Sequence, residues 1–353
     1  MPTRRISVPS LLLPLALVPL AACGGGAPEE AAATPATYMT HRNWGALPPG
    51  REWGRVSGVH VDPNGTDVWV FERCGADDCI ESDDPAVLRF SSGGSLLASF
   101  GADMFLRPHG LYVDPEGNVW VTDGRIARAA ELETHPDAAT KGNQVVKFSP
   151  TGEVLLVLGT PGSAGDPPAA LDQPNDVVVA PNGEILVAEG HGSAGPGRIS
   201  RFAADGTYLG SFGGQGSGPG QFAVPHALAF DSRGRLFVAD RGNSRIQVFD
   251  SDYELVAEWK QFGRPNDIFI DEDDTMYVVD SESGDERNPG MRRGIYIGSA
   301  RDGTVTNYVA AHPSDREQDG PHGTMGEGVT VDVAGNIFVG EVSLSGMTMF
   351  MRH

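Results

Sequence analysis

The feature that most constrains this chain is a 17-residue pattern that occurs six times. Each copy holds an apolar run, a turn built on Asp-x-x-Gly or a close variant, and a second apolar run that ends in an acid, which together predict a β-hairpin. The copies lie about 40 to 65 residues apart, which leaves room for four strands in each unit. A regular repeat of this length predicts an all-β chain folded as a propeller or another array of four-stranded sheets. The copies are VSGVHVDPNGTDVWVFE (56–72), RPHGLYVDPEGNVWVTD (107–123), QPNDVVVAPNGEILVAE (173–189), VPHALAFDSRGRLFVAD (224–240), RPNDIFIDEDDTMYVVD (264–280) and MGEGVTVDVAGNIFVGE (325–341).

Two stretches of the fourth unit, QGSGPGQFAVPHALAF and VADRGNSRIQVF, resemble NHL repeats, a family that builds six-bladed β-propellers. The last unit ends one strand short, after FVGEVSLSGMTMFMRH. We expect the segment 37–47, TYMTHRNWGAL, to supply the missing strand and close the ring. Closure would remove the exposed edges that an open array of sheets would leave.

The first residues differ in composition from the repeats. Arg4 and Arg5 precede an apolar run that ends in Leu20-Ala21-Ala22-Cys23, which resembles a bacterial lipobox. The resemblance implies a lipoprotein signal peptide at 1–22 and acylation of Cys23. The Gly- and Ala-rich segment that follows predicts a flexible tether over 23–37 and a propeller over 38–353. An ordinary secretory signal is the alternative; a membrane helix is disfavoured by the short, Pro-containing run.

Charge and cysteine content narrow the function classes. The formal net charge is −21, which disfavours nucleic-acid binding because phosphates would be repelled. Besides Cys23, the chain has Cys74 and Cys79. In an exported protein, an oxidising compartment would allow this pair to form a local disulfide. A two-thiol metal site is the weaker alternative because no second pair exists. We expect an exported monomer of the bacterial cell envelope that meets the membrane only through its lipid and acts on a small-molecule or peptide substrate.

One position in every copy should face the propeller axis. It lies five residues before the Asp of the turn and is occupied by Ser57, His109, Asn175, His226, Asn266 and Glu327. His109, His226 and Glu327 belong to the second, fourth and sixth blades, which an approximate threefold rotation relates. Their side chains can therefore converge. Two imidazoles and a carboxylate suit a divalent metal, with zinc the first choice and iron also acceptable. Neutral histidines lining the channel are the alternative.

The acids that end the second runs should lie on the same face as these histidines, since the paired strands are antiparallel. A ring of six acids could bind cations. We favour a structural role instead, with each acid accepting hydrogen bonds from its own blade. The long segments 124–143, 190–197 and 281–293 should gather at that same rim, where a rigid scaffold usually carries function.

The second, third and fourth copies with their flanks resemble one NHL family in particular, the peptidyl-α-hydroxyglycine α-amidating lyases (peptidylamidoglycolate lyases). That family cleaves an N–C bond and releases glyoxylate, and the resemblance implies a zinc held by three histidines, arginines for the substrate carboxylate and a tyrosine base. His109 and His226 match two zinc ligands, Arg73 and Arg241 match the arginines, and Met325 matches a methionine near the third ligand.

The chain departs from the family pattern at three positions. Glu327 replaces the third histidine, Gly328 replaces a calcium-binding aspartate, and His191 stands at the tyrosine position, where it could act as the base. Calcium is therefore doubtful as a cofactor. His322 is an alternative third ligand, although the hairpin register favours Glu327.

Three functions remain open at this point. The first is a metal-dependent lyase with Arg73, His191 and Arg241 as catalytic residues. The second is a calcium- or metal-dependent lactonase-like hydrolase that uses the oxygen-rich set Glu327, Asn175 and Asn266. The third is a non-catalytic propeller that binds a protein or ligand.

Overall fold

The structure is a computed structural model that describes residues 1–2, 36–192, 194–311 and 326–353. The chain divides into a unit Met1–Thr34, almost all of which lies outside the described residues, and a compact unit Pro35–His353. The predicted signal peptide, the lipid-bearing Cys23 and most of the tether therefore lie outside the described residues, as do His322 and Met325. In the part of the chain that the structure describes, no helix has the length and apolarity needed to cross a bilayer.

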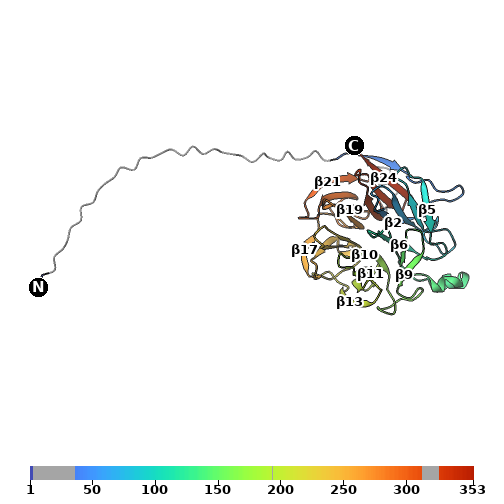
Figure 1. Ribbon diagram of the computed structural model, residues 1–353, viewed down its shortest axis with the longest axis horizontal. Coiled ribbons are helices and arrows are strands. Elements are labelled where there is room, and N and C mark those ends of the chain that lie inside the picture. The colour runs from blue at the N-terminus through green and yellow to red at the C-terminus, as the bar shows by residue number, and fades with distance from the viewer. Residues whose placement is uncertain (3–35, 193, 312–325) are drawn as a thin grey trace. The chain divides into compact units, whose positions relative to one another are not determined.

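The unit Pro35–His353 is a ring of six four-stranded antiparallel sheets, as the repeats predict (Figure 1). The first three sheets contain β2 (Val56–Val61), β3 (Val68–Glu72), β4 (Val87–Phe90) and β5 (Leu96–Phe100); β6 (Pro108–Val113), β7 (Val119–Asp123), β8 (Gln144–Phe148) and β9 (Val154–Leu158); and β10 (Pro174–Val179), β11 (Ile185–Glu189), β12 (Arg198–Phe202) and β13 (Tyr208–Gly213).

The next two sheets contain β14 (Pro225–Phe230), β15 (Leu236–Asp240), β16 (Arg245–Phe249) and β17 (Leu255–Trp259); and β18 (Asp267–Ile270), β19 (Thr275–Asp280), β20 (Gly294–Ser299) and β21 (Val305–Ala310). Short helical segments interrupt two connections: α1 (Ala129–Thr134) and the 3-10 turn η1 (Pro136–Thr140) follow β7, and the 3-10 turn η2 (Arg241–Asn243) follows β15. The first strand of each blade lies nearest the axis and the fourth lies at the periphery, as the labels β2, β6 and β10 against β5, β9 and β13 show in Figure 1.

The sixth blade is built from both ends of the propeller unit. Its strands are β22 (Gly328–Val331), β23 (Ile337–Glu341), β24 (Gly346–Arg352) and β1 (Tyr38–Arg42), and β1 pairs antiparallel with β24 from Tyr38 opposite Arg352 to Arg42 opposite Thr348. This confirms that the segment after residue 37 closes the ring. Just beyond β1, the ring centre of Trp44 lies 4.7 Å from that of Phe338 in the sixth blade and 5.7 Å from that of Phe90 in the first.

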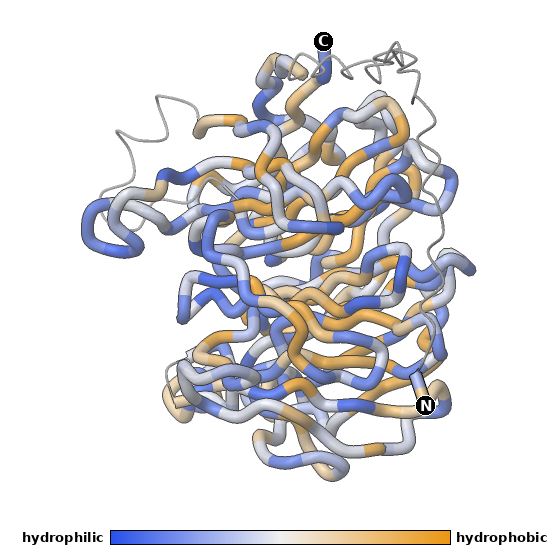
Figure 2. Tube along the Cα trace, turned by 90° about the vertical axis from the view of Figure 1, so that its left-hand side faces the viewer, coloured by the Kyte–Doolittle hydropathy of each residue, from blue (hydrophilic) through white to orange (hydrophobic). Residues whose placement is uncertain are grey.

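The hydrophobic core is divided among the interfaces between blades. Each of six buried clusters joins side chains from two neighbouring blades. Between the first and second blades, for example, the ring centre of Phe105 lies 5.0 Å from that of Phe71 and 6.2 Å from that of Phe148. Figure 2 shows apolar strands running through the interior and hydrophilic turns at the surface. Because every blade buries both faces, each depends on its two neighbours, and closure matters for all of them.

The six acids at the ends of the second strands are fully or almost fully buried (Glu72, Asp123, Glu189, Asp240, Asp280 and Glu341). In the first five blades the acid accepts a backbone hydrogen bond from the loop that leads into its blade. Asp123 accepts hydrogen bonds from the amides of Leu106 and Arg107 at 2.9 and 2.6 Å. Glu189 accepts the Asp172 amide at 2.8 Å and pairs with Arg198 at 2.9 Å. The predicted structural role of these acids is confirmed, and we assign them no metal.

Removing β1 tests closure. A chain that begins at residue 44 loses the five residue pairs with β24, and we expect its free energy of unfolding to fall by about 2–5 kcal/mol, since each backbone hydrogen bond contributes a net 0.5–1.5 kcal/mol. Guanidinium denaturation against a chain that begins at residue 36 measures the difference. Equal midpoints for the two chains would contradict the role of β1.

Candidate metal centre

The six axis-facing residues predicted from the repeat lie at or just before the start of the inner strands, and all are at least 92% buried. In the first four blades the strand pairing is irregular at this residue: the register shifts between Val56 and Gly58, Pro108 and Leu111, Pro174 and Asp176, and Pro225 and Ala227. A bulge of this kind leaves one residue out of the ladder and redirects its side chain. The preceding proline, which cannot donate to a ladder, favours the bulge in three of the four.

These side chains form hydrogen bonds from one blade to the next around the axis. The bonds run from Ser57 Oγ to the Pro108 carbonyl at 2.8 Å, from His109 Nδ1 to the Asn175 carbonyl at 2.7 Å, from Asn175 Nδ2 to the Pro225 carbonyl at 2.8 Å, from His226 Nδ1 to the Asn266 carbonyl at 2.7 Å, and from Asn266 Nδ2 to Glu327 Oε2 at 3.0 Å. Each polar side chain is thus held by the backbone or side chain of its neighbouring blade.

The two carbonyl contacts determine the tautomers of His109 and His226. A carbonyl oxygen only accepts, so each Nδ1 must carry the proton and each Nε2 is left with a lone pair. Both Nε2 atoms are buried and have no hydrogen-bond partner. Burial lowers the pKa of both imidazoles below the usual value of 6.5; the nearby His226 lowers the pKa of His109 further, and the Arg241 charge does the same for His226. Both side chains are therefore neutral acceptors at neutral pH.

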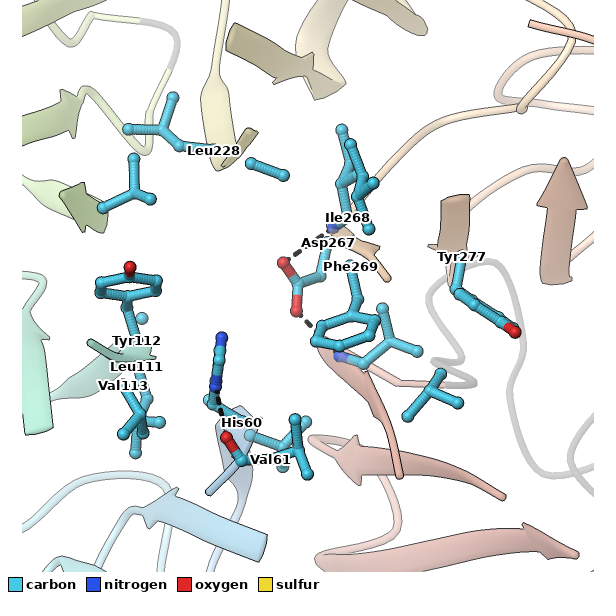
Figure 3. Close-up of a pocket in the computed structure, with 18 of the residues that line it drawn as sticks. His60, Val61, Leu111, Tyr112, Val113, Leu228, Asp267, Ile268, Phe269 and Tyr277 are labelled. Atoms are coloured by element: carbon cyan, nitrogen blue, oxygen red, sulfur yellow. Dashed lines mark hydrogen bonds between the residues drawn. The ribbon is translucent and has the colours of Figure 1, made fainter. Parts of the chain in front are cut away.

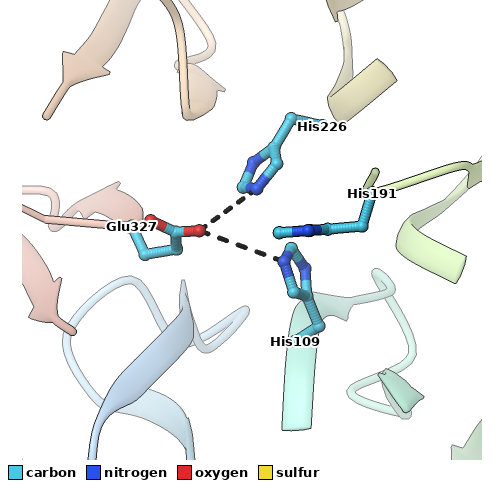
Figure 4. Close-up of side chains that lie close together, drawn as sticks. All are labelled: His109, His191, His226 and Glu327. Carbon is cyan, nitrogen blue, oxygen red and sulfur yellow. Dashed lines mark ion pairs between the residues drawn. The ribbon is translucent and has the colours of Figure 1, made fainter. Parts of the chain in front are cut away.

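Glu327 faces these two nitrogens (Figure 4). Its Oε1 lies 3.1 Å from His226 Nε2 and 3.9 Å from His109 Nε2, contacts that are ion pairs only if the imidazoles are protonated. Burial alone would raise the pKa of the Glu327 carboxyl, but the Arg241 guanidinium, 3.4 Å away, opposes it, and the pKa lies well below its usual range. An ionised oxygen and two nitrogen lone pairs therefore meet in a buried space.

A divalent cation would satisfy all three of these ligand atoms at once. Neither Nε2 has a donor, and Glu327 Oε1 accepts only the long contact from Arg241 Nη1 at 3.4 Å, so this group of acceptors is electrostatically unfavourable in a buried site. Tetrahedral zinc with bonds of about 2.0–2.2 Å needs ligand atoms roughly 3.3–3.6 Å apart, which lies between the observed 3.1 and 3.9 Å. The backbone carbonyls on Nδ1 supply the outer contact that metal-bound histidines usually have. The donor set of His109, His226 and Glu327 is thus compatible with a divalent metal.

His191 joins the cluster from the loop that follows β11. Its ring centre lies 5.0 Å from that of His109 and 5.4 Å from that of His226, and the candidate ligand atoms of all four residues lie within 4.8 Å of one another. Its Nε2 accepts from Arg241 Nη2 at 3.4 Å. Burial, and then the Arg241 charge, hold the pKa of His191 well below 6.5. The sequence placed His191 near the site as a base but did not reveal it as a fourth member of the cluster.

The two predicted arginines are buried beside this cluster. Arg241, in η2, donates from Nη1 to Glu327 at 3.4 Å, and its Nε is buried without a partner. Arg73 donates from Nε to the Pro108 carbonyl at 3.1 Å and from Nη1 to Asp77 at 3.2 Å. Burial, and then the neighbouring charge of Arg107, lower the pKa of Arg73 to about 10. Both guanidinium groups remain cationic at neutral pH.

The alternative set of oxygen ligands, Glu327, Asn175 and Asn266, is less available for a cation. Asn266 Oδ1 accepts the Ser281 amide at 3.2 Å, and its Nδ2 bonds Glu327. Asn175 keeps one unpartnered buried oxygen. At residue 328 a Cβ would lie 2.9 Å from the Ser57 carbonyl oxygen, so the close approach of β2 leaves little room for a side chain there. Cys74 and Cys79 form a disulfide bond on the loop after β3.

Comparisons with known proteins agree with this architecture. A family model described as NHL repeat matches residues 105–125 and 222–249. NHL repeat-containing protein 3 of Homo sapiens is 34% identical over 193 residues, 53% of this chain and 50% of the relative. The Caenorhabditis elegans protein "Probable peptidyl-alpha-hydroxyglycine alpha-amidating lyase pgal-1" is 30% identical over 242 residues, 63% of each chain. The chain thus spans about half the length of the first of these relatives and under two thirds of the second.

Solved structures support the fold itself. A virginiamycin B lyase from Staphylococcus aureus aligns with a TM-score of 0.54 over 89% of this chain and 88% of that chain. Its sequence identity to this chain is 16%, so the match concerns the propeller fold alone.

The electrostatic description of the cluster makes a pH-dependent prediction. With folded-state pKa values below 6.5, His109 and His226 should stay neutral, with the proton on Nδ1, as the pH of the chelator-treated protein falls from 8 to 6. The contribution of the two neutral imidazoles to the free energy of unfolding is fully present above pH 6.5. It is lost as the pH falls through the pKa values of the folded protein. Long-range ¹H–¹⁵N spectra, assigned with His109→Gln and His226→Gln, report the tautomers. Titration of both rings near 6.5 would contradict the description.

Proposed function

We propose that this NHL-repeat six-bladed β-propeller, which resembles the amidating lyases, is a metal-dependent lyase. Its site would be centred on His109, His226 and Glu327. The reaction cleaves the N–C bond of a group of the peptidyl α-hydroxyglycine type and releases an amide and glyoxylate. The observation that carries the proposal is the convergence of one carboxylate and two neutral imidazole nitrogens that have no hydrogen-bond donor, in a chain similar to such lyases.

His109 Nε2, His226 Nε2 and Glu327 Oε1 would hold the metal, with zinc as the first choice and iron as the second. Such an ion, when bound, lowers the pKa of a hydroxyl that reaches it. The bonds from Nδ1 to the Asn175 and Asn266 carbonyls keep both rings oriented towards the site. Calcium is a poor fit because two imidazole ligands favour a softer ion.

Arg241 would bind the carboxylate of the hydroxyglycine group. Its guanidinium lies at the cluster and has an unpartnered Nε, and a planar guanidinium binds a carboxylate through two parallel hydrogen bonds. Arg73 would add a second cation on the first-blade side of the site. Both residues are buried, so their charges act in a medium that screens them weakly.

His191 would be the base. Its low pKa keeps the ring neutral, and its Nε2 now accepts from Arg241. When Arg241 turns to a substrate carboxylate, Nε2 becomes free to accept the proton of the substrate hydroxyl. Loss of that proton forms the aldehyde C=O bond of glyoxylate, the C–N bond breaks, and the departing amide nitrogen takes up a proton.

We further propose that the protein is exported and anchored through Cys23. The support within the described residues is the Cys74–Cys79 disulfide, because such bonds persist in oxidising compartments.

Elemental analysis of the purified protein tests the metal. We expect about one equivalent of zinc or iron, and at least tenfold weaker binding of that metal in Glu327→Gln and His226→Gln, because removing a ligand leaves an incomplete site. Glu116→Gln, on an exposed turn, is the matched control. Less than one tenth of an equivalent of every divalent metal, even after incubation with zinc, would support a binding propeller instead.

Glyoxylate release from N-benzoyl-α-hydroxyglycine tests the reaction. Arg241→Gln should lower kcat/KM by roughly 10²- to 10³-fold, the usual cost of losing one partner of a buried charge pair. His191→Phe should lower kcat more than KM, because it removes a proton acceptor rather than a binding group. Arg233→Gln, on an exposed turn, should change neither constant. Hydrolysis of lactones without glyoxylate release would contradict the lyase assignment.

A further inference from the structure

Three arginines surround one carboxylate at the edge of the candidate site. Asp77 Oδ1 lies 3.0 Å from Arg55 Nη1, 3.2 Å from Arg73 Nη1 and 3.8 Å from Arg107 Nη2. We refer to Arg55, Arg73, Arg107 and Asp77 as the arginine cradle. Three guanidinium groups against one carboxylate give the cradle a surplus of two positive charges, in a chain whose net charge is −21.

The propeller repeat places the cradle next to the metal centre. Arg55 and Arg107 occupy equivalent positions in adjacent blades, two residues before Ser57 and His109. Gln173 and Val224 stand at this position in the third and fourth blades, so the repeat itself does not require arginine there. Arg73 bonds the carbonyl of Pro108, the residue that precedes the candidate ligand His109.

A short closed loop holds Asp77 in the cradle. The Cys74–Cys79 disulfide closes this loop. The Arg55 amide donates to the Ala76 carbonyl at 3.0 Å, and the Arg73 amide donates to the Arg55 carbonyl at 3.0 Å. Asp77 is therefore fixed beside Arg55, although its own side chain is 48% exposed. This half-exposed carboxylate lies where an anion from solution could reach the same guanidinium groups.

Holding these arginines together is costly, which distinguishes the cradle from an ordinary surface ion pair. Arg73 is 2% exposed, and its burial and the charge of Arg107 both disfavour its ionised form. Glu327 and Asp77 both stabilise the charge of Arg73, but Asp77 is the one carboxylate that pairs with all three arginines. A second anion would relieve the repulsion between them.

The other side of the site has a comparable group of arginines, because Arg287 lies 3.3 Å from Glu282 in addition to two further arginines. Arg264 stands in the fifth blade at the position equivalent to Arg55 and donates to Glu282 at 2.5 Å. Glu282 is only 19% exposed and also lies 3.8 Å from Arg241. The two carboxylates differ in exposure, 19% for Glu282 against 48% for Asp77, so an anion from solution reaches the cradle more readily.

We propose that the arginine cradle is a second anion subsite and that the substrate carries a carboxylate on its acyl side, in addition to that of the hydroxyglycine group. The substrate class is thus an acidic N-acyl α-hydroxyglycine. Arg55 and Arg107 determine this specificity, and Asp77 occupies the cradle until the substrate carboxylate displaces it or joins it. The choice of substrate class rests on the proposed function, whereas binding of the anion does not.

Two unreactive dipeptides that differ by one charge test the subsite. N-acetyl-glutamyl-glycine and N-acetyl-glutaminyl-glycine share the terminal carboxylate and nearly the same shape. We expect calorimetry on the protein as purified to show roughly tenfold tighter binding of the glutamyl probe, the size expected for one charge-assisted contact. This ratio should fall towards one in Arg55→Gln/Arg107→Gln and persist in Arg233→Gln.

Asp77→Asn provides a variant that keeps every arginine. Removing the competing charge should tighten binding of the glutamyl probe severalfold, whereas a purely structural role for Asp77 predicts weaker binding. Equal affinities of the two probes for the unmodified protein, or an unchanged ratio in the double variant, would overturn the subsite even if glyoxylate release is observed. A charge-dependent ratio in a protein that releases no glyoxylate would support the subsite and count against the lyase alone.

Discussion

The arrangement at the centre of this propeller depends on one repeated interaction, the hydrogen bond from an axis-facing side chain to the neighbouring blade. In His109 and His226 this bond uses Nδ1 and a backbone carbonyl. It orients each ring, selects its tautomer and leaves Nε2 as an acceptor. Because the same bond also ties one blade to the next, the features that hold the inner strands together are those that prepare the candidate centre.

The rest of the fold keeps this ring of bonds rigid. Apolar clusters between the blades and buried acids at the strand ends hold neighbouring sheets in place, and β1 supplies the final sheet. The charges nearby are then easy to rationalise. Arg241 keeps Glu327 ionised, burial keeps the imidazoles neutral, and the outer arginines make the rim of the site cationic within an acidic protein. These effects together favour a metal and an anionic substrate.

Much of this could be predicted from the sequence because a repeat converts sequence position into spatial position. His109, His226 and Glu327 occupy one repeat position in alternate blades, and the structure brings them together. Other features could not be predicted. The lone pairs on Nε2 depend on backbone carbonyls of other blades, the approach of His191 depends on a loop outside the repeat, and Asp77 meets Arg107 through a loop of another blade. Such contacts follow no sequence spacing, so only the folded ring reveals them.

Diffraction from crystals grown with one equivalent of zinc, recorded on both sides of the zinc absorption edge, would test the central claim most directly. The account predicts a single anomalous peak on the propeller axis, about 2.0–2.2 Å from His109 Nε2, His226 Nε2 and a carboxylate oxygen of Glu327. A peak held by other residues, or no peak, with each Nε2 bonded to a proton donor, would contradict it.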